Sequence, residues 1–424
     1  MLGMTLFPHS SQAAAGRHGA GLWAVALAFL AVLAFSTVPT PLYAIYQARD
    51  GFSTFLITVI FAAYAVGVAG ALFFAGHVSD WLGRRRTLVA ALLLALVSAA
   101  VFLLWDTLPG LLVGRVLSGL AVGVVTATST AFLVELHLAQ RPGTSPKRAQ
   151  IVATTANLGG LGLGPIVAGV LAETVASPLT VPYAVFAALL VVAVIAVALA
   201  PETVTRPQRR PAYRPQRVAV PAAARGSFFS AAAGAFVAFA AFGLFTSLAP
   251  SFLAGTLGHT NHALAGVPAV TGFGAAIVAQ LAAGAWDVRR LVGTGTAALS
   301  AGLALLVTAL WASSLALFLT GVVITGVGAG LLFKGGIARV SALAAASPNR
   351  AEVLAGFFLA GYLGLSVPVL GLGVASQFMA PKVALLGFAA LLLVGGAFAA
   401  RPRTDRERHG QRTDGPRAFA TQNG

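Results

Sequence analysis

The chain contains twelve apolar runs that are each long enough to cross a lipid bilayer as a helix. A bilayer core about 30 Å thick requires about 20 apolar residues per helix. The runs are far longer than a strand of a membrane barrel, and an isolated strand leaves its backbone polar groups unpaired in lipid. The sequence therefore predicts an all-α integral membrane protein with twelve transmembrane helices. The runs lie, within a few residues, at 21–46, 55–75, 87–105, 110–134, 149–172, 180–200, 227–250, 264–286, 291–311, 315–338, 351–378 and 382–400.

The composition excludes the common soluble classes. Only 9% of the 424 residues are charged, and 58% are apolar. A soluble globular domain carries about 25% charged residues, so a soluble enzyme of this length is excluded. The apolar content also excludes a disordered chain. The absence of cysteine excludes disulfides and thiolate metal sites, but it indicates nothing about the compartment.

The cations are distributed unequally between the two sides of the predicted membrane. If the N-terminus lies inside, all but three of the 27 Lys and Arg residues fall on the inner side, with Lys334 and Arg339 counted at the inner end of the tenth run. The exceptions are Arg49 and Lys382 in outer loops and Arg115 within a run. The positive-inside rule then places both termini in the cytoplasm, and we expect a bacterial plasma (inner) membrane. The net charge of +16 reports orientation and contact with anionic lipid rather than nucleic-acid binding.

A Pro- and Arg-rich segment divides the chain into six runs and six runs. An aspartate followed by arginines comes after the second run, at Asp80, and again after the eighth, at Asp287. Repeated six-helix halves are a common transporter architecture, with the substrate site between them near the bilayer midplane. We therefore expect a cytoplasmic N-terminal tail, an N-terminal six-helix bundle, a cytoplasmic linker, a C-terminal six-helix bundle and a basic cytoplasmic tail, at 1–20, 21–200, 201–226, 227–400 and 401–424.

A short polar turn follows the second run. It reads Gly76-His-Val-Ser-Asp80-Trp-Leu-Gly83-Arg84-Arg85. Gly83 permits a tight turn, and Asp80 comes within reach of Arg84 if the turn is helical. A plain charged cytoplasmic loop is the alternative interpretation. The segment resembles the GxxxDxxGRR signature of the major facilitator superfamily, which lies between the second and third spans of that family.

This resemblance implies the fold and a gate. The fold is that of a transporter with two pseudo-symmetric six-helix bundles that works by alternating access. The family's aspartate, here Asp80, interacts with the N-terminal end of span eleven in the outward-open state. The family's arginine, here Arg84, pairs with an acid at the inner end of span four, here Glu135. A carboxylate near a helix N-terminus contributes about 0.3–1 kcal/mol, enough to bias a conformational equilibrium.

Span four carries an arginine inside an apolar run. Arg115, Gly119 and Gly123 recur at intervals of four and therefore share one helical face. Small residues allow close helix approach, and an intramembrane arginine usually faces the protein interior and has a function. The alternative is an arginine that snorkels to the outer interface. The pattern resembles the family's RxxxG motif, which implies a role in proton coupling.

Span five contains Gly160-Leu-Gly-Leu-Gly164-Pro165-Ile-Val-Ala168-Gly169. The spacing predicts a smooth face, and the proline removes one backbone hydrogen bond and kinks the helix. The segment resembles the GxxxGPxxGG motif of the family's antiporters, with Ala168 in place of the first terminal glycine. Ordinary helix packing would explain the same residues. The resemblance favours export over import.

None of the eleven acidic residues lies at the centre of a run. If transport is coupled to protons, the coupling group is therefore an end-of-span acid such as Glu173 or Glu135, or coupling acts through Arg115. A cavity with an arginine and no acid suits neutral or anionic substrates better than cationic ones. Polar or aromatic residues on otherwise apolar runs are candidates to line this cavity, although ordinary packing explains each of them equally well. These candidates are Thr40, Tyr43, Asn157, Phe245, Gln280 and Tyr362.

The sequence has no phosphate loop, no HExxH and no GxSxG, so we expect no enzyme activity, catalytic residue, metal or cofactor. Our first hypothesis is a monomeric exporter in the lipid bilayer that moves small amphiphilic molecules or drugs in exchange for protons. An importer of sugars or organic acids on the same fold is the second hypothesis. A non-transporting membrane receptor or scaffold is the third.

Overall fold

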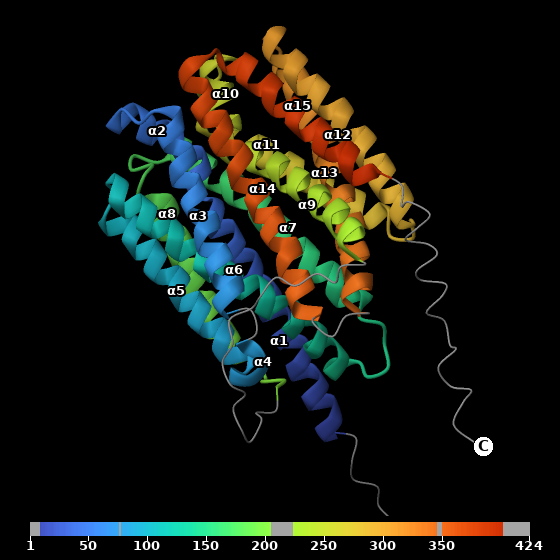
Figure 1. Ribbon diagram of the computed structural model, residues 1–424. Coiled ribbons are helices and arrows are strands. Elements are labelled where there is room, and N and C mark those ends of the chain that lie inside the picture. Colours follow the sequence, from blue (N-terminus) through green and yellow to red (C-terminus); the bar gives the residue numbers. More distant parts are fainter. Residues whose placement is uncertain (1–8, 76–77, 205–223, 346–349, 402–424) are drawn as a thin grey trace, which may run out of the picture.

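The structure is a computed structural model that describes residues 9–75, 78–204, 224–345 and 350–401 (Figure 1). These residues form helices and no strand, and twelve of the helical segments are long and apolar enough to cross a membrane. The predicted all-α, twelve-span fold is confirmed. Gly76, the linker after Val204 and the tail after Arg401 lie outside the described residues.

The helices fall into two groups that stand side by side, coloured blue to green and yellow to red in Figure 1. The first group is α1 (His9–Thr37), α2 (Pro39–Asp50), α3 (Thr54–Ala75), α4 (Ser79–Leu82), α5 (Arg84–Leu104), α6 (Leu108–Gln140), α7 (Lys147–Thr174) and α8 (Val181–Ala198). The second group is α9 (Arg225–Ser247), α10 (Ala249–Gly255), α11 (His262–Ala282), α12 (Val288–Trp311), α13 (Leu315–Ala345), α14 (Arg350–Phe378) and α15 (Pro381–Ala400).

The first span of each group is broken near its end. The sequence predicts one helix over 21–46 that is kinked by its prolines, but α1 ends at Thr37 and α2 begins at Pro39. Proline has no N–H to continue a helix, yet it is favoured in the first turn of a new one. The same break separates α9 from α10, where Pro250 lies in the first turn. The two groups therefore share this feature.

The fourth span of each group is longer than its apolar run. Helix α6 has 33 residues and α13 has 31. At 1.5 Å per residue they are about 50 and 47 Å long, which exceeds a bilayer core of about 30 Å. The predicted spans at 110–134 and 315–338 are too short because they follow the apolar part alone, whereas the helices continue beyond it.

The groups join mainly through α7 with α11 and α3 with α14, and α2 also packs against α10 and α11. Helices α5, α8 and α15 expose large apolar side chains such as Val97, Val192 and Val394, which suits contact with lipid. We call the end of the molecule where α5, α7 and α9 begin, with Arg84, Lys147 and Arg225, the basic end. The other is called the opposite end.

Candidate functional site

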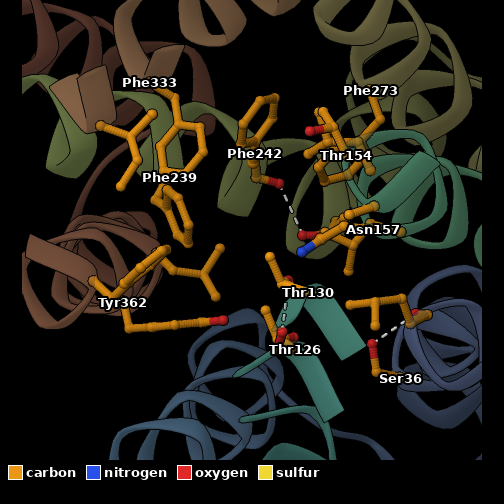
Figure 2. A pocket seen from close by; sticks show the side chains of 18 of the residues that line it. Ser36, Thr126, Thr130, Thr154, Asn157, Phe239, Phe242, Phe273, Phe333 and Tyr362 are labelled. Carbon is orange, nitrogen blue, oxygen red and sulfur yellow. Dashed lines mark hydrogen bonds between the residues drawn. The ribbon is translucent and has the colours of Figure 1, made fainter. Parts of the chain in front are cut away.

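A cavity of about 480 Å³ lies between the two groups of helices. Figure 2 shows hydroxyl and amide side chains of the first group facing aromatic side chains of the second group across it. The polar wall includes Ser36, Thr126, Thr130, Thr154 and Asn157. The aromatic wall includes Phe239, Phe242, Phe273, Phe333, Phe358 and Tyr362. The cavity is therefore amphipathic and has the size of a small-molecule site.

The cavity opens toward the basic end. Three of its lining residues, Thr130, Gln150 and Ala338, are exposed, and Gln150 lies in the first turn of α7. At the opposite end the groups are in direct contact. The Thr40 hydroxyl donates a hydrogen bond of 2.7 Å to the carbonyl oxygen of Thr246, which joins α2 to α9. One end of the cavity is thus open while the other is closed.

Glu173 adds a second contact at the opposite end. Its carboxylate accepts a hydrogen bond of 2.8 Å from the backbone N–H of His262, the first residue of α11. A carboxylate is favourable at a helix N-terminus because the unpaired N–H groups there carry partial positive charge. Glu173 therefore stabilises the contact of α7 with α11 and does not line the cavity described here.

Arg115 lines the cavity and is 2% exposed. It does not snorkel to the outer interface. Its Nη1 donates a hydrogen bond of 2.6 Å to the carbonyl oxygen of Ser36, and its Nε has no hydrogen-bond partner. The guanidinium carbon lies 4.8 Å from the ring centroid of Tyr64 and 5.6 Å from that of Phe61. Cation–π contacts and a backbone carbonyl thus hold a buried cation without an acid.

Lys334 is the second cation of the cavity, whereas the sequence pattern predicts it at the inner end of span ten. Its Nζ donates a hydrogen bond to the backbone carbonyl oxygen of Gln280 on α11. Because α13 continues to Ala345, Lys334 lies within the helix rather than at its end. A single lysine inside an apolar run was the signal that could have identified it.

Three of the six candidate cavity residues line the cavity, namely Asn157, Gln280 and Tyr362. Thr40, Tyr43 and Phe245 are buried outside its lining. Thr40 is held in the contact with α9 that closes the opposite end.

The rotation of α9 decides the position of Phe245. Phe242 and Thr246 lie one turn apart on the face toward the cavity. The ring of Phe245 packs instead against α11, where a Cβ on Gly272 would lie 2.6 Å from it. Because α9 is apolar on all sides, its sequence does not indicate which phenylalanine faces the cavity.

The gate loop forms an ion-pair network at the basic end. Arg84 Nη2 lies 2.9 Å from Glu135 Oε1, and Arg84 Nη1 lies 2.6 Å from Asp80 Oδ1. Gly83 has φ +104°, a backbone conformation that residues other than glycine rarely adopt. The structure thus brings together Asp80, Arg84 and Glu135, and all three belong to the first group of helices.

Glu202 completes this network, and sequence reasoning missed it. Its carboxylate accepts hydrogen bonds from the backbone N–H groups of Arg84, at 2.9 Å, and Arg85, at 3.2 Å. Arg85 Nη1 donates to the carbonyl oxygen of Ala200, at 3.3 Å. Glu202 therefore caps the N-terminus of α5 from a position more than a hundred residues away. An isolated acid at the start of an arginine-rich linker was the available signal.

The related segment of the second group has a simpler structure. The Asp287 carboxylate accepts a hydrogen bond of 2.8 Å from the backbone N–H of Arg290 and caps α12. The Arg290 guanidinium lies over the Trp286 ring, 4.2 Å from its centroid. Asp287 thus serves as an ordinary N-cap.

The glycines of span four allow α6 to approach α3 closely. A Cβ on Gly119 would collide with the carbonyl oxygen of Tyr64, and a Cβ on Gly123 would lie 2.5 Å from Cβ of Ala71. Arg115 on the same helix is thereby held near the Phe61 and Tyr64 rings of α3.

The glycines of span five face two different helices. A Cβ on Gly160 or Gly164 would collide with backbone oxygens of α1, whereas a Cβ on Gly169 would collide with the carbonyl oxygen of His262 on α11. Pro165 lies inside α7, beside Gly266 of α11. The motif therefore packs α7 against its own group and against the other group.

Comparison with known proteins gives one family and a set of related folds. A family model described as the Major Facilitator Superfamily matches residues 24–286, which is more than half of the chain. No curated protein sequence matches the chain.

Among solved structures, the chain is similar to a bacterial homologue of the human lysosomal transporter Spinster in an inward-facing, unoccupied conformation. The TM-score is 0.64 at 15% identity, over 91% of this chain and 96% of that one. The human organic anion transporter MFSD10 gives a TM-score of 0.63 at 17% identity, over 90% and 99% of the two chains. A mutant of the nucleoside transporter NupG gives 0.63 at 14% identity, over the same shares. At these identities the similarity shows the fold alone.

Proposed function

Because this chain belongs to the major facilitator superfamily, we propose that it exports small amphiphilic molecules in exchange for protons, by alternating access. One observation carries the proposal. An amphipathic cavity between the two helix groups is open at the basic end and closed at the opposite end. Family and fold indicate a membrane transporter rather than an enzyme.

The asymmetry of the cavity supports alternating access. If the basic end is cytoplasmic, as the positive-inside rule requires, the structure represents an inward-open state. The bacterial Spinster homologue of similar fold is described as inward-facing. The contacts that close the opposite end are the hydrogen bonds of Thr40 with Thr246 and of Glu173 with α11, together with the packing of α7 and α2 on α11. If these contacts broke and new contacts formed at the basic end, the cavity would open to the outside.

The lining supports an amphiphilic substrate. Aromatic rings supply a large apolar surface, and hydroxyl and amide groups supply a few hydrogen bonds that orient a ligand. The cavity lies between the two helix groups, which is the usual place for a transporter site. Tyr362 and Asn157 represent the two walls in Figure 2.

Proton exchange is the more specific part of the proposal. The glycine–proline motif of α7 resembles that of antiporters, and Arg115 at the cavity is a candidate coupling residue. Glu173 is a second candidate, since its carboxylate holds α11 when the opposite end is closed. Protonation of that carboxylate would remove its charge at the helix N-terminus and favour opening toward the outside.

The test uses the full-length protein in proteoliposomes loaded with a fluorescent aromatic amphiphile. We expect transport that accelerates with an imposed pH gradient and slows when a protonophore dissipates it. Transport that ignores the gradient would refute proton exchange. Transport of sugars or organic acids in the same direction as the protons would show an importer, and no transport of any compound would favour a receptor or scaffold.

A further inference from the structure

Resting on this proposed function, we propose that the preferred substrate is an amphiphilic anion whose charged group binds between Lys334 and the side-chain amide of Gln280. The anionic group is a carboxylate or a group of similar charge and size. Its apolar body lies against the aromatic wall of the same cavity.

Two neighbouring residues that carry hydrogen-bond donors line this part of the cavity. Lys334 Nζ on α13 contacts the backbone carbonyl of Gln280 on α11, so the two residues are neighbours. An ammonium has three donors, and this contact uses one. Gln280 is 9% exposed, and its Nε2 is buried without a hydrogen-bond partner. A buried donor without a partner is costly, and a ligand oxygen would satisfy it.

The charge of the lining favours an anion. Lys334 and Arg115 both line the cavity, and no Asp or Glu is among the lining residues that the structure describes. A buried cation without a counter-charge is costly in a medium of low polarity, and a bound anion offsets this cost. The same field repels a cationic ligand.

Lys334, rather than Arg115, is the direct ligand. The rings of Phe61 and Tyr64 and the carbonyl oxygen of Ser36 hold the guanidinium of Arg115 in place, and only its Nε is buried without a partner. Arg115 strengthens the positive potential from the other wall. Lys334 has a flexible stem and a compact charge that can follow a ligand.

An aromatic cluster adjoins the proposed anion site. Phe333 is the sequence neighbour of Lys334, and its ring centroid lies 5.5 Å from that of Phe239. Phe239 in turn lies 5.3 Å from Tyr362, edge to face. All three line the cavity, so one ligand can contact the ammonium with its anionic group and these rings with its body.

The test measures binding to the purified full-length protein in detergent by isothermal titration calorimetry. The probes share one aromatic body and differ in charge: naphthalene-2-carboxylate, naphthalene-2-carboxamide and naphthalen-2-ylmethylammonium. We expect the carboxylate to bind at least about tenfold more tightly than either of the others. Octanoate distinguishes an aryl body from a lipid-derived alkyl chain, since the aromatic wall predicts weaker binding of octanoate than of the naphthoate.

Substitutions test whether Lys334 supplies the positive charge that binds the carboxylate. Lys334→Gln should abolish the preference for the carboxylate, and Lys334→Arg should retain most of it. Lys382→Gln removes the same charge outside this cavity, where Lys382 lies over the Trp311 ring, and should leave binding unchanged. If Lys334→Gln unfolds early in a thermal scan, Gln280→Leu tests the same site and should weaken binding of the carboxylate about three- to tenfold.

Equal binding of the carboxamide or the ammonium to the unaltered protein would overturn the inference. So would a carboxylate preference that survives in Lys334→Gln or, where that variant fails to fold, undiminished carboxylate affinity in Gln280→Leu. Binding in detergent requires no transport, whereas the proteoliposome assay tests transport itself. The anion site and the exporter proposal can therefore fail separately.

Discussion

Replacement of Gly266 by alanine should shift the equilibrium between the two access states. Gly266 lies where α11 crosses α7, and an added Cβ would lie 2.5 Å from the carbonyl oxygen of Pro165, 2.6 Å from its carbonyl carbon and 2.7 Å from Cα of Ile166. All three atoms belong to the backbone, so no side chain can rotate away. The two helices must therefore separate at this point.

The expected size of the shift follows from the cost of overpacking. An extra group in a tightly packed contact costs about 1–3 kcal/mol. This cost applies to the state in which α7 and α11 touch, so it favours opening at the opposite end by about 5- to 150-fold. Gly274 supplies the matched control, because it lies on the same helix and an added Cβ there would meet no atom within 4 Å.

Cysteine labelling provides the assay, because the chain has no cysteine of its own. Ser247 is 0% exposed and follows Thr246, whose carbonyl takes part in the contact that closes the opposite end. In a Ser247→Cys background, Gly266→Ala should raise the rate of reaction with a membrane-impermeant maleimide at least about fivefold. Gly274→Ala should not. Equal rates in both variants, with unchanged thermal unfolding, would refute the reasoning.

Three further substitutions test other contacts. Asp80→Asn should reduce transport while the amount of protein in the membrane stays unchanged, and normal flux in this variant would contradict the gate role. Asp287→Asn is the control and should transport normally, because asparagine caps a helix as well as aspartate does. Glu202→Ala removes the cap of α5 and should lower the free energy of unfolding by about 0.5–2 kcal/mol, measured by denaturation in detergent. Thr40→Val removes the hydrogen bond to Thr246 and should raise labelling of Ser247→Cys about two- to tenfold, and an unchanged rate would show that this bond does not hold the opposite end closed.

The contacts between neighbouring residues of the gate loop were predictable from the sequence, but the contact of Glu202 with this loop was not. The short spacing of Asp80 and Arg84 predicts their contact, and the family resemblance implied the partner Glu135. Glu202 was not predictable because it reaches the start of α5 through tertiary structure, from the far end of the sixth span. No sequence spacing encodes such a contact.

The sequence also predicts only some of the residues on the spans that line the cavity. Sequence reasoning selected Asn157, Gln280 and Tyr362, which line it, but also Phe245, which packs against α11. In a soluble protein the polar face of a helix shows which side is buried. In lipid the outward face is apolar as well, so the rotation of a helix leaves little trace in its sequence.

The sequence by itself determined the number of spans, the all-α class and the motifs that resemble the family, because chain length against bilayer thickness and backbone pairing in lipid are local constraints. It also identified Arg115 as an intramembrane cation. Only the tertiary structure decided that Lys334 joins Arg115 at one cavity, and that this cavity is open at the basic end and closed at the other. Those outcomes depend on how helices distant in the chain pack and rotate, and the side-chain contacts that set this packing are not local in sequence.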